Sequence, residues 1–249
     1  MRFFVSVSYN GERYSGWQKQ PNATGIQEVL EDAMGKALGF RVELTGAGRT
    51  DAGVSASGYL AHFDAPSPIK EPAQLLYKIN AILPTDIVAN FFAAAPEDAH
   101  ARFDATSRSY SYKVHTAKDP FAWHSFYCKF PLDVEAMNRA AAMLLGRRDF
   151  SSFEKVGADN KTSICNVTHA LWTAVDADHL QFDITADRFL RNMVRAIVGT
   201  LLDVGRGKLA PEEIPALLDK GDRSAAGQSV PGEPLTLCSI TYPYPLLPL

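Results

Sequence analysis

Two stretches of the chain show the same succession of hydrophobic periodicities, and this succession restricts the fold more than any other feature. Apolar residues that alternate every second position predict strands, and apolar residues at 3.6-residue spacing predict helices. In the first stretch the pattern predicts strand, helix, strand, strand, helix and strand over residues 2–9, 24–38, 40–45, 59–63, 74–83 and 86–94.

The second stretch repeats that order without visible sequence identity to the first. Its expected elements lie over residues 109–115, 133–145, 164–175, 180–185, 189–204 and 235–242. Two successive split βαβ (βαββαβ-like) halves of this kind predict an α+β fold with mainly antiparallel sheets and an active-site cleft between the halves. The expected domains are residues 1–105 and 106–249.

Local signals refine the first predicted helix. Thr24 with Gln27 three residues later has the pattern of a capping box, in which each side chain bonds the other's backbone. Gly39 follows the last apolar position and predicts the end of the helix, because glycine adopts the left-handed conformation of a C-terminal cap.

Composition limits the class of protein. With 249 residues, 46% apolar residues and a net charge of −3, the chain can bury a core but has no overall excess of basic residues. A site for a polyanion must therefore be a local patch. No apolar run is long enough to span a bilayer, and polar residues interrupt the N-terminus too early for a signal peptide, so we expect a cytoplasmic protein. Three distant cysteines predict neither a disulfide framework nor a zinc site.

A glycine-rich stretch, GAGRTDAGVSASG at residues 46–58, is a candidate functional loop. It lacks the lysine of a phosphate-binding loop, and a strand rather than a helix is expected after it, which disfavours nucleotide binding. Two interpretations remain open. The loop is either an ordinary hairpin connection with solvated Arg49 and Asp51, or a catalytic turn that exposes Asp51. A catalytic Asp51 needs a nearby cation to keep it ionised.

The last long predicted helix offers such a cation. On a helix that includes residues 189–204, Arg191 and Arg195 would lie four residues apart along the edge of a broad apolar face. An arginine in that position is partly buried and favours a carboxylate partner. The alternative is that both side chains cover apolar surface with their stems and reach water with their charged ends.

Four segments together resemble the tRNA pseudouridine synthase A family over nearly the whole chain. They are SYNGERYSGWQKQPNATGIQEVLEDA, GAGRTDAGVSASGYLAHFDA, HARFDATSRSYSYKV and DRFLRNMVRAIVGTLLDVGRG. The resemblance implies an isomerase that converts uridine to pseudouridine at positions 38, 39 and 40 in the anticodon stem-loop of tRNA. It also implies a homodimer that needs no cofactor and no metal.

The resemblance assigns roles to individual residues. Asp51 matches the family's catalytic aspartate, the nucleophile, and Arg195 matches the basic residue that pairs with it. Tyr110 matches the tyrosine that stacks on the target base, and Arg49 lies near substrate. Two positions depart from the family pattern: Ser55 stands where many members have histidine, and Tyr59 where they have glutamine.

Further basic residues are candidates for contacts with the RNA backbone: Lys19, Arg102, Arg108 and Arg191. Pseudouridine formation breaks the bond from ribose to uracil N1 and rejoins the base through C5, so one carboxylate can serve without a redox group or donor. Two alternatives are a non-catalytic RNA-binding module on the same fold and a nucleotide-binding enzyme. The combination of Asp51, Arg195 and Tyr110 favours the isomerase.

Overall fold

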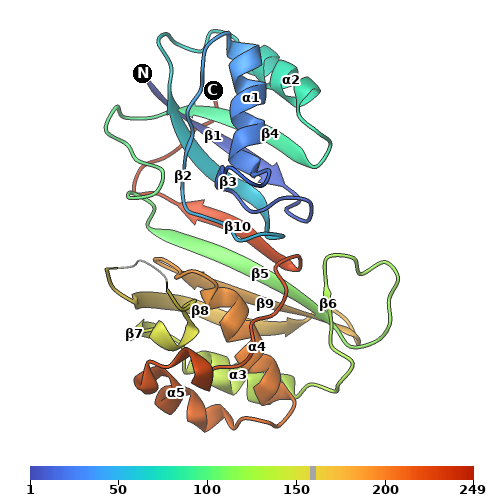
Figure 1. Ribbon diagram of the computed structural model, residues 1–249. Helices are drawn as coiled ribbons and strands as arrows, with labels where there is room; N and C mark the ends of the chain where they lie inside the picture. The colour runs from blue at the N-terminus through green and yellow to red at the C-terminus, as the bar shows by residue number, and fades with distance from the viewer. Residues whose placement is uncertain (158–160) are drawn as a thin grey trace. The chain divides into compact units, whose positions relative to one another are not determined.

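A computed structural model describes residues 1–157 and 161–249 and divides the chain into two units (Figure 1). The first unit contains residues 1–106 and 237–249, and the second contains residues 107–236. The C-terminal segment therefore returns to the unit in which the chain begins.

The first unit is an antiparallel sheet with two helices. Strand β1 lies between β3 and β4 and is antiparallel to both, and the short β2 pairs with β3. Beyond β3 the strand order continues to β10, whose residues from Leu237 onward belong to this unit. The elements are β1 (Arg2–Tyr9), α1 (Ile26–Leu38), β2 (Thr45–Gly46), β3 (Ser55–Asp64), α2 (Pro72–Ile82), β4 (Ile87–Ala94) and β10 (Leu235–Thr241).

Helix α1 buries the face that its apolar spacing predicts. Ile26, Leu30 and Met34 are fully buried, and α1 packs beside α2, which in turn contacts β4. Burial of large aliphatic side chains of this kind contributes about 1.5–3 kcal/mol each before the entropic cost of folding. Gly39 has a φ of 77° and its N–H donates to Gly35 O at 2.9 Å, which confirms the predicted end of the helix.

Two local predictions in this unit are wrong. The helix is capped by Gly25 without a side-chain bond, so the Thr24 capping box does not form. Residues 40–44 are not a strand, because the backbone of Leu44 is bonded by α1 instead of a neighbouring strand. Its N–H donates to Glu31 Oε1 at 3.0 Å and its carbonyl accepts from Gln27 Nε2 at 3.0 Å.

The second unit is also built on an antiparallel sheet. Strand β9 lies between β5 and β8, and β7 extends the sheet beyond β8; β6 pairs with β5 in parallel. The main elements are β5 (Ser107–His115), β6 (Phe126–Tyr127), α3 (Val134–Ala142), β7 (Gly146–Asp149), β8 (Ile164–Ala174), β9 (His179–Ala186), α4 (Met193–Gly205) and α5 (Ile214–Lys220). Helix α3 packs against both β8 and α4.

The helices of this unit are shorter than their sequence pattern predicts. Asp133 caps α3 as expected and accepts from Ala136 N at 2.9 Å, but the helix ends at Ala142 rather than at residue 145. Helix α4 begins at Met193 rather than at residue 189. Asn192 has a φ of 67°, and a residue in that left-handed conformation cannot continue a right-handed helix.

The α+β prediction is confirmed. Within the described residues, the strand pairs defined by register are antiparallel except β5 with β6. In the same residues no helix has both the length and the hydropathy needed to cross a bilayer.

A buried histidine in the first unit makes folding sensitive to pH. His62 is 6% exposed and its Nδ1 accepts from Ala101 N at 3.0 Å. Burial, with nearby Arg2 and His100, lowers the pKa of His62 from 6.5 to about 4. The folded state therefore binds fewer protons here than the unfolded state between these two values, so this contribution is present above pH 6.5 and is lost as pH falls toward 4.

We expect the substitution His62→Gln to flatten the acid side of the stability profile, because the amide oxygen can accept from Ala101 without titrating. The wild type should lose about 3 kcal/mol more unfolding free energy than this variant between pH 6.5 and 4. Denaturant unfolding over that range measures the difference, with exposed His169→Gln as control. Parallel profiles for the wild type and His62→Gln would contradict the assignment.

Candidate functional site

The glycine-rich loop of the first unit forms a tight turn at Asp51. The N–H of Val54 donates to Asp51 O at 3.2 Å, and Gly53, the third residue of this turn, has a φ of 80°. A positive φ at that position is typical of a type II turn and favours glycine. The glycine at 53 thus has a local structural reason, and the turn holds the backbone of Asp51.

The segment that follows β1 supports this turn by direct backbone contact. Trp17 N donates to Thr50 O at 3.2 Å, and Gly53 N donates to Tyr14 O at 3.3 Å. A Cβ on Gly16, whose φ is 89°, would lie 2.3 Å from Thr50 O. Only glycine permits so close an approach of the two chain segments.

Tyr14 is itself anchored. Its hydroxyl donates to Asp86 Oδ1 at 2.8 Å, and Arg13 pairs with the same carboxylate. Burial, followed by the bond to Asp86, raises the pKa of Tyr14 to about 12, so the hydroxyl stays protonated and continues to donate. Arg13 and Tyr14, which lie beside the loop, are therefore held by Asp86, the residue directly before β4.

An aromatic pair lies under the start of the loop. The rings of Trp17 and Tyr59 are stacked with centroids 3.9 Å apart and planes at 27°, and both residues are almost fully buried. The Tyr59 hydroxyl donates to Gly48 O and accepts from Gly48 N at 3.3 Å. A Cβ on Gly46 would lie 2.0 Å from Tyr59 Oη, so the loop backbone crosses directly over this pair.

Side chains alternate in exposure through the turn. Thr50 is 7% exposed and its Oγ1 is hydrogen bonded to the Tyr9 hydroxyl at 2.9 Å. Arg49 is exposed and Asp51 is partly exposed on either side of it. The loop can thus present a guanidinium and a carboxylate to a substrate while the residue between them fastens it to the core.

In the second unit, Arg195 lies in the first turn of α4. Its Nε donates to Val230 O at 2.7 Å, and Val230 N donates to Arg195 O at 3.2 Å. This reciprocal pair of bonds fixes the guanidinium relative to a segment outside the helix. Sequence reasoning identified Arg195 but not Val230, because a backbone contact leaves no signal in residue type.

Arg191 does not share that helix face. It precedes Asn192 and lies outside α4, so the prediction of two arginines four residues apart on one helix is wrong. Asn192 Nδ2 donates to Ser229 Oγ at 2.6 Å, a contact that favours the left-handed conformation immediately before the start of the helix. Arg191 is exposed, and its carbonyl accepts from Lys155 N at 3.0 Å.

Residues 226–231 pack along α4 and contact the helix at Gly199 and Thr200. Thr200 Oγ1 accepts from Gly227 N at 2.8 Å. A Cβ on Gly199 would lie 1.8 Å from Gln228 O, so that helix position has no room for a side chain. The segment that bonds Arg195 is therefore held at several points along one side of α4.

Tyr110 lies in β5 opposite Ile184 of β9 and is partly exposed. Its ring meets Phe189 edge to face, with centroids 5.2 Å apart and planes at 89°. This contact restricts the orientation of the Tyr110 ring.

The other predicted basic residues have individual settings. Lys19 pairs with Glu31 at 3.5 Å, and Arg108 Nη1 donates to Asp187 O at 2.8 Å. Arg102 lies 5.8 Å from the ring centroid of Phe103, which is exposed. Each of these three side chains therefore has a contact within its own unit.

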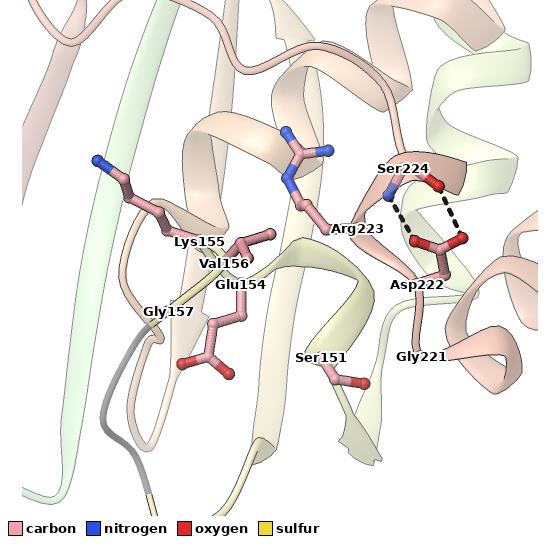
Figure 2. Close-up of a pocket in the computed structure, with 9 residues that line it drawn as sticks. All are labelled: Ser151, Glu154, Lys155, Val156, Gly157, Gly221, Asp222, Arg223 and Ser224. Atoms are coloured by element: carbon pink, nitrogen blue, oxygen red, sulfur yellow. Dashed lines mark hydrogen bonds between the residues drawn. The ribbon is translucent and has the colours of Figure 1, made fainter.

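A hollow of about 680 Å³ lies in the second unit (Figure 2). Its charged side chains are of both signs, and none of the predicted site residues lines it. Arg223 at its rim donates to Gly227 O at 3.0 Å and to Ser229 Oγ at 2.8 Å, and so supports residues 226–231. The lining residues are Ser151, Glu154, Lys155, Val156, Gly157, Gly221, Asp222, Arg223 and Ser224.

In the described part of the chain, no three His, Cys, Asp or Glu side chains gather as a metal site would require. Cys128 and Cys165 are buried and Cys238 is exposed, and none of these three cysteines forms a disulfide.

Comparison with known proteins identifies the family. A family model described as tRNA pseudouridine synthase matches residues 5–104 and 140–243. The tRNA pseudouridine synthase A of Parabacteroides distasonis is 48% identical over 250 residues, which cover 100% of this chain and 98% of the relative. The chain belongs to the tRNA pseudouridine synthase family.

Other members of the tRNA pseudouridine synthase family align almost as completely. The tRNA pseudouridine synthase A of Bacteroides fragilis is 46% identical over 243 residues, covering 97% of this chain and 96% of the relative. That of Bacteroides thetaiotaomicron is 48% identical over 245 residues, covering 97% and 91%. The resemblance drawn from the sequence is thereby confirmed.

The close contact at Gly199 gives a prediction. Gly199→Ala should displace residues 227–230, because its Cβ would overlap Gln228 O. We expect a loss of about 1–3 kcal/mol in unfolding free energy and slower turnover, as Arg195 loses its fixed partner. Thermal melting and an activity assay on the same preparation measure both.

Gly35→Ala is the matched control, because Gly35 lies inside α1 and its Cβ would meet only Phe40 O at 3.4 Å. It should be neutral or stabilise by about 0.5–1 kcal/mol, since alanine favours helix over glycine. If Gly199→Ala behaves like Gly35→Ala in both assays, the packing of residues 226–231 has no bearing on activity.

Proposed function

We propose that the protein isomerises uridine to pseudouridine in the anticodon stem-loop of tRNA, at positions 38, 39 and 40, with Asp51 as the nucleophile. The enzyme class follows from the family, which covers nearly the whole chain. The observation that supports Asp51 is its place in a turn whose backbone is fixed on both sides while its own side chain stays partly exposed.

The chemistry suits a single carboxylate. The bond from ribose C1′ to uracil N1 breaks, the base rotates, and C1′ joins C5, whose proton is lost as N1 gains one. Atoms and charge balance without an electron acceptor or a group donor. Asp51 can assist either by adding to the base or by taking a proton beside the sugar, and both need the ionised carboxylate.

Two residues of the second unit complete the proposed site. We propose that Arg195 pairs with Asp51 and that Tyr110 stacks on the target base. The bond from Arg195 Nε to Val230 O supports the first role, because it restricts the plane of the guanidinium. The partial exposure of Tyr110, with its ring restricted by Phe189, supports the second, because a base removed from its stack binds against an aromatic side chain.

Further contacts with tRNA are proposed for Arg49, Lys19, Arg102, Arg108 and Arg191. Because the chain has a net charge of −3, these residues would form a local basic track rather than a uniformly basic surface. We also propose that the protein is cytoplasmic and forms a homodimer. Sedimentation at micromolar protein, with and without tRNA, tests the dimer.

Loss of the charge at residue 51 should separate catalysis from binding. Asp51→Asn is expected to abolish release of tritium from tRNA labelled at uridine C5, because an amide can neither add to the base nor accept the proton. Folding and tRNA retention should stay close to wild type, since asparagine fits the turn. Tritium release, filter retention and thermal melting on one preparation measure the three properties.

The control is Asp32→Asn, which removes an exposed carboxylate of α1 that pairs with Lys36 in its own helix. This variant should turn over at the wild-type rate. Appreciable tritium release by Asp51→Asn would favour the alternative in which Asp51 is a structural residue of the loop. Mapping of pseudouridine in transcripts with cytidine at 38, 39 or 40 tests the positions separately.

The basic track predicts a salt dependence. Joint replacement of Arg102, Arg108 and Arg191 by glutamine should weaken tRNA binding, because fewer phosphates of the RNA are then neutralised by the protein. The slope of log affinity against log salt should fall by about one unit for each such phosphate. Exposed Arg41→Gln serves as the control. Unchanged affinity and slope in the triple variant would exclude these residues from the interface.

A further inference from the structure

Tyr59 holds both backbone polar groups of a single residue in the catalytic loop. Its hydroxyl donates to the carbonyl of Gly48 and accepts from the N–H of the same residue at 3.3 Å. Gly48 directly precedes Arg49 and lies three residues before Asp51. We propose that Tyr59 is a positioning residue that fixes the peptide planes at Gly48 and so directs Arg49 and Asp51 toward the substrate.

The tyrosine ring can serve this purpose because it cannot swing away. Tyr59 is 1% exposed in β3 and stacks on Trp17, which is 2% exposed. Above the pair, the backbone at Gly46 comes so close that a Cβ would lie 2.0 Å from Tyr59 Oη and 2.5 Å from Trp17 Nε1. The hydroxyl is therefore delivered to Gly48 from a rigid, packed ring.

The contact of Tyr59 with Gly48 lies between two other points at which the loop backbone is hydrogen bonded. Ala47 N donates to Leu60 O at 2.9 Å, and the carbonyl of Thr50 accepts from Trp17 N at 3.2 Å. Between these two fixed points lie Gly48 and Arg49, and Tyr59 adds a third at Gly48. Arg49 thus extends from backbone held immediately before and after it, which limits the directions its guanidinium can take.

A purely structural role makes a different prediction from a positioning role. If Tyr59 only fills the core, phenylalanine should replace it with little effect, because the ring and its stacking on Trp17 remain. If the hydroxyl positions the loop, phenylalanine should preserve the fold but release Gly48. The substitution Tyr59→Phe therefore separates the two roles.

Tyr242→Phe is a matched control. Tyr242 is another tyrosine of the first unit whose hydroxyl donates to a backbone carbonyl, that of Ala101, at 2.6 Å. Both variants remove one such donor, so their melting temperatures should agree within about 3 °C. Tyr59→Phe also removes the acceptor for Gly48 N, so activity is compared together with melting temperature, and a loss of activity without a matching loss of stability reports the place of the hydroxyl.

The first measurement is steady-state tritium release from tRNA labelled at uridine C5. We expect Tyr59→Phe to lower kcat by about tenfold to a hundredfold with KM for tRNA nearly unchanged, because misplacement of reacting groups acts on the chemical step. Tyr242→Phe should keep the wild-type kcat. A kcat for Tyr59→Phe equal to that of Tyr242→Phe would overturn the inference.

The second measurement does not depend on activity. Trypsin cuts after arginine, and Arg49 is exposed in a loop that the structure holds in place. Cleavage at the Arg49–Thr50 bond, followed by mass spectrometry, should be several-fold faster in Tyr59→Phe than in Tyr242→Phe, because local opening sets the rate. Equal cleavage rates would also count against the inference.

The inference rests on the proposed catalytic role of Asp51, and the two can fail separately. An active Asp51→Asn would refute that role without changing the trypsin result for Tyr59→Phe. An inactive Asp51→Asn together with a fully active Tyr59→Phe would refute only the positioning role of Tyr59.

Discussion

The stack of Trp17 on Tyr59 is the interaction on which the glycine-rich loop that carries Asp51 depends. It brings a strand residue of β3 and a residue of the segment after β1 into one buried pair, and the glycine-rich backbone passes over it at Gly46. The pair supports the loop in two ways. Trp17 bonds Thr50 through its backbone N–H, and Tyr59 bonds Gly48 through its hydroxyl. The loop that contains the turn at Asp51 therefore packs directly on the buried Trp17–Tyr59 pair. Its glycines are needed both where the backbone comes close to these rings, at Gly46, and where φ is positive, at Gly53.

In the second unit, the side chain of Arg195 is also held by backbone groups of a neighbouring segment. Arg195 must keep a long, flexible side chain in one orientation, and it does so through a backbone carbonyl at Val230. That carbonyl is placed by residues 226–231, which approach α4 where Gly199 leaves room and Thr200 offers an acceptor. In both units a charged side chain proposed for the reaction depends on a neighbouring chain segment that contributes backbone groups. Such support lowers the entropic cost of holding the reacting groups in place.

The sequence predicts the features that depend on local pattern. The end of α1 at Gly39 and the cap of α3 at Asp133 follow from residue type, and the structure confirms them. Most of the predicted strands and helices also occur, but β6, β7 and α5 had no counterpart in the predicted order. The failures arise where side chains compete for the backbone. Glu31 and Gln27 bond Leu44 and prevent a strand, and the left-handed Asn192 removes Arg191 from α4. The roles proposed for Asp51, Arg195 and Tyr110 rest on the family's motifs. The support from Tyr59 and Val230 had no sequence signal, because each acts through a contact with distant backbone.

We expect the loop that carries Asp51 to be formed already before tRNA binds. Hydrogen exchange at the amides of Trp17, Gly53 and Val54 tests it most directly, because these N–H groups donate to Thr50, Tyr14 and Asp51 in the turn itself. We predict that all three exchange slowly in the free protein and that added tRNA changes their rates little. Fast exchange in the free protein that becomes slow only with tRNA would show that the substrate orders the loop, and would contradict this claim.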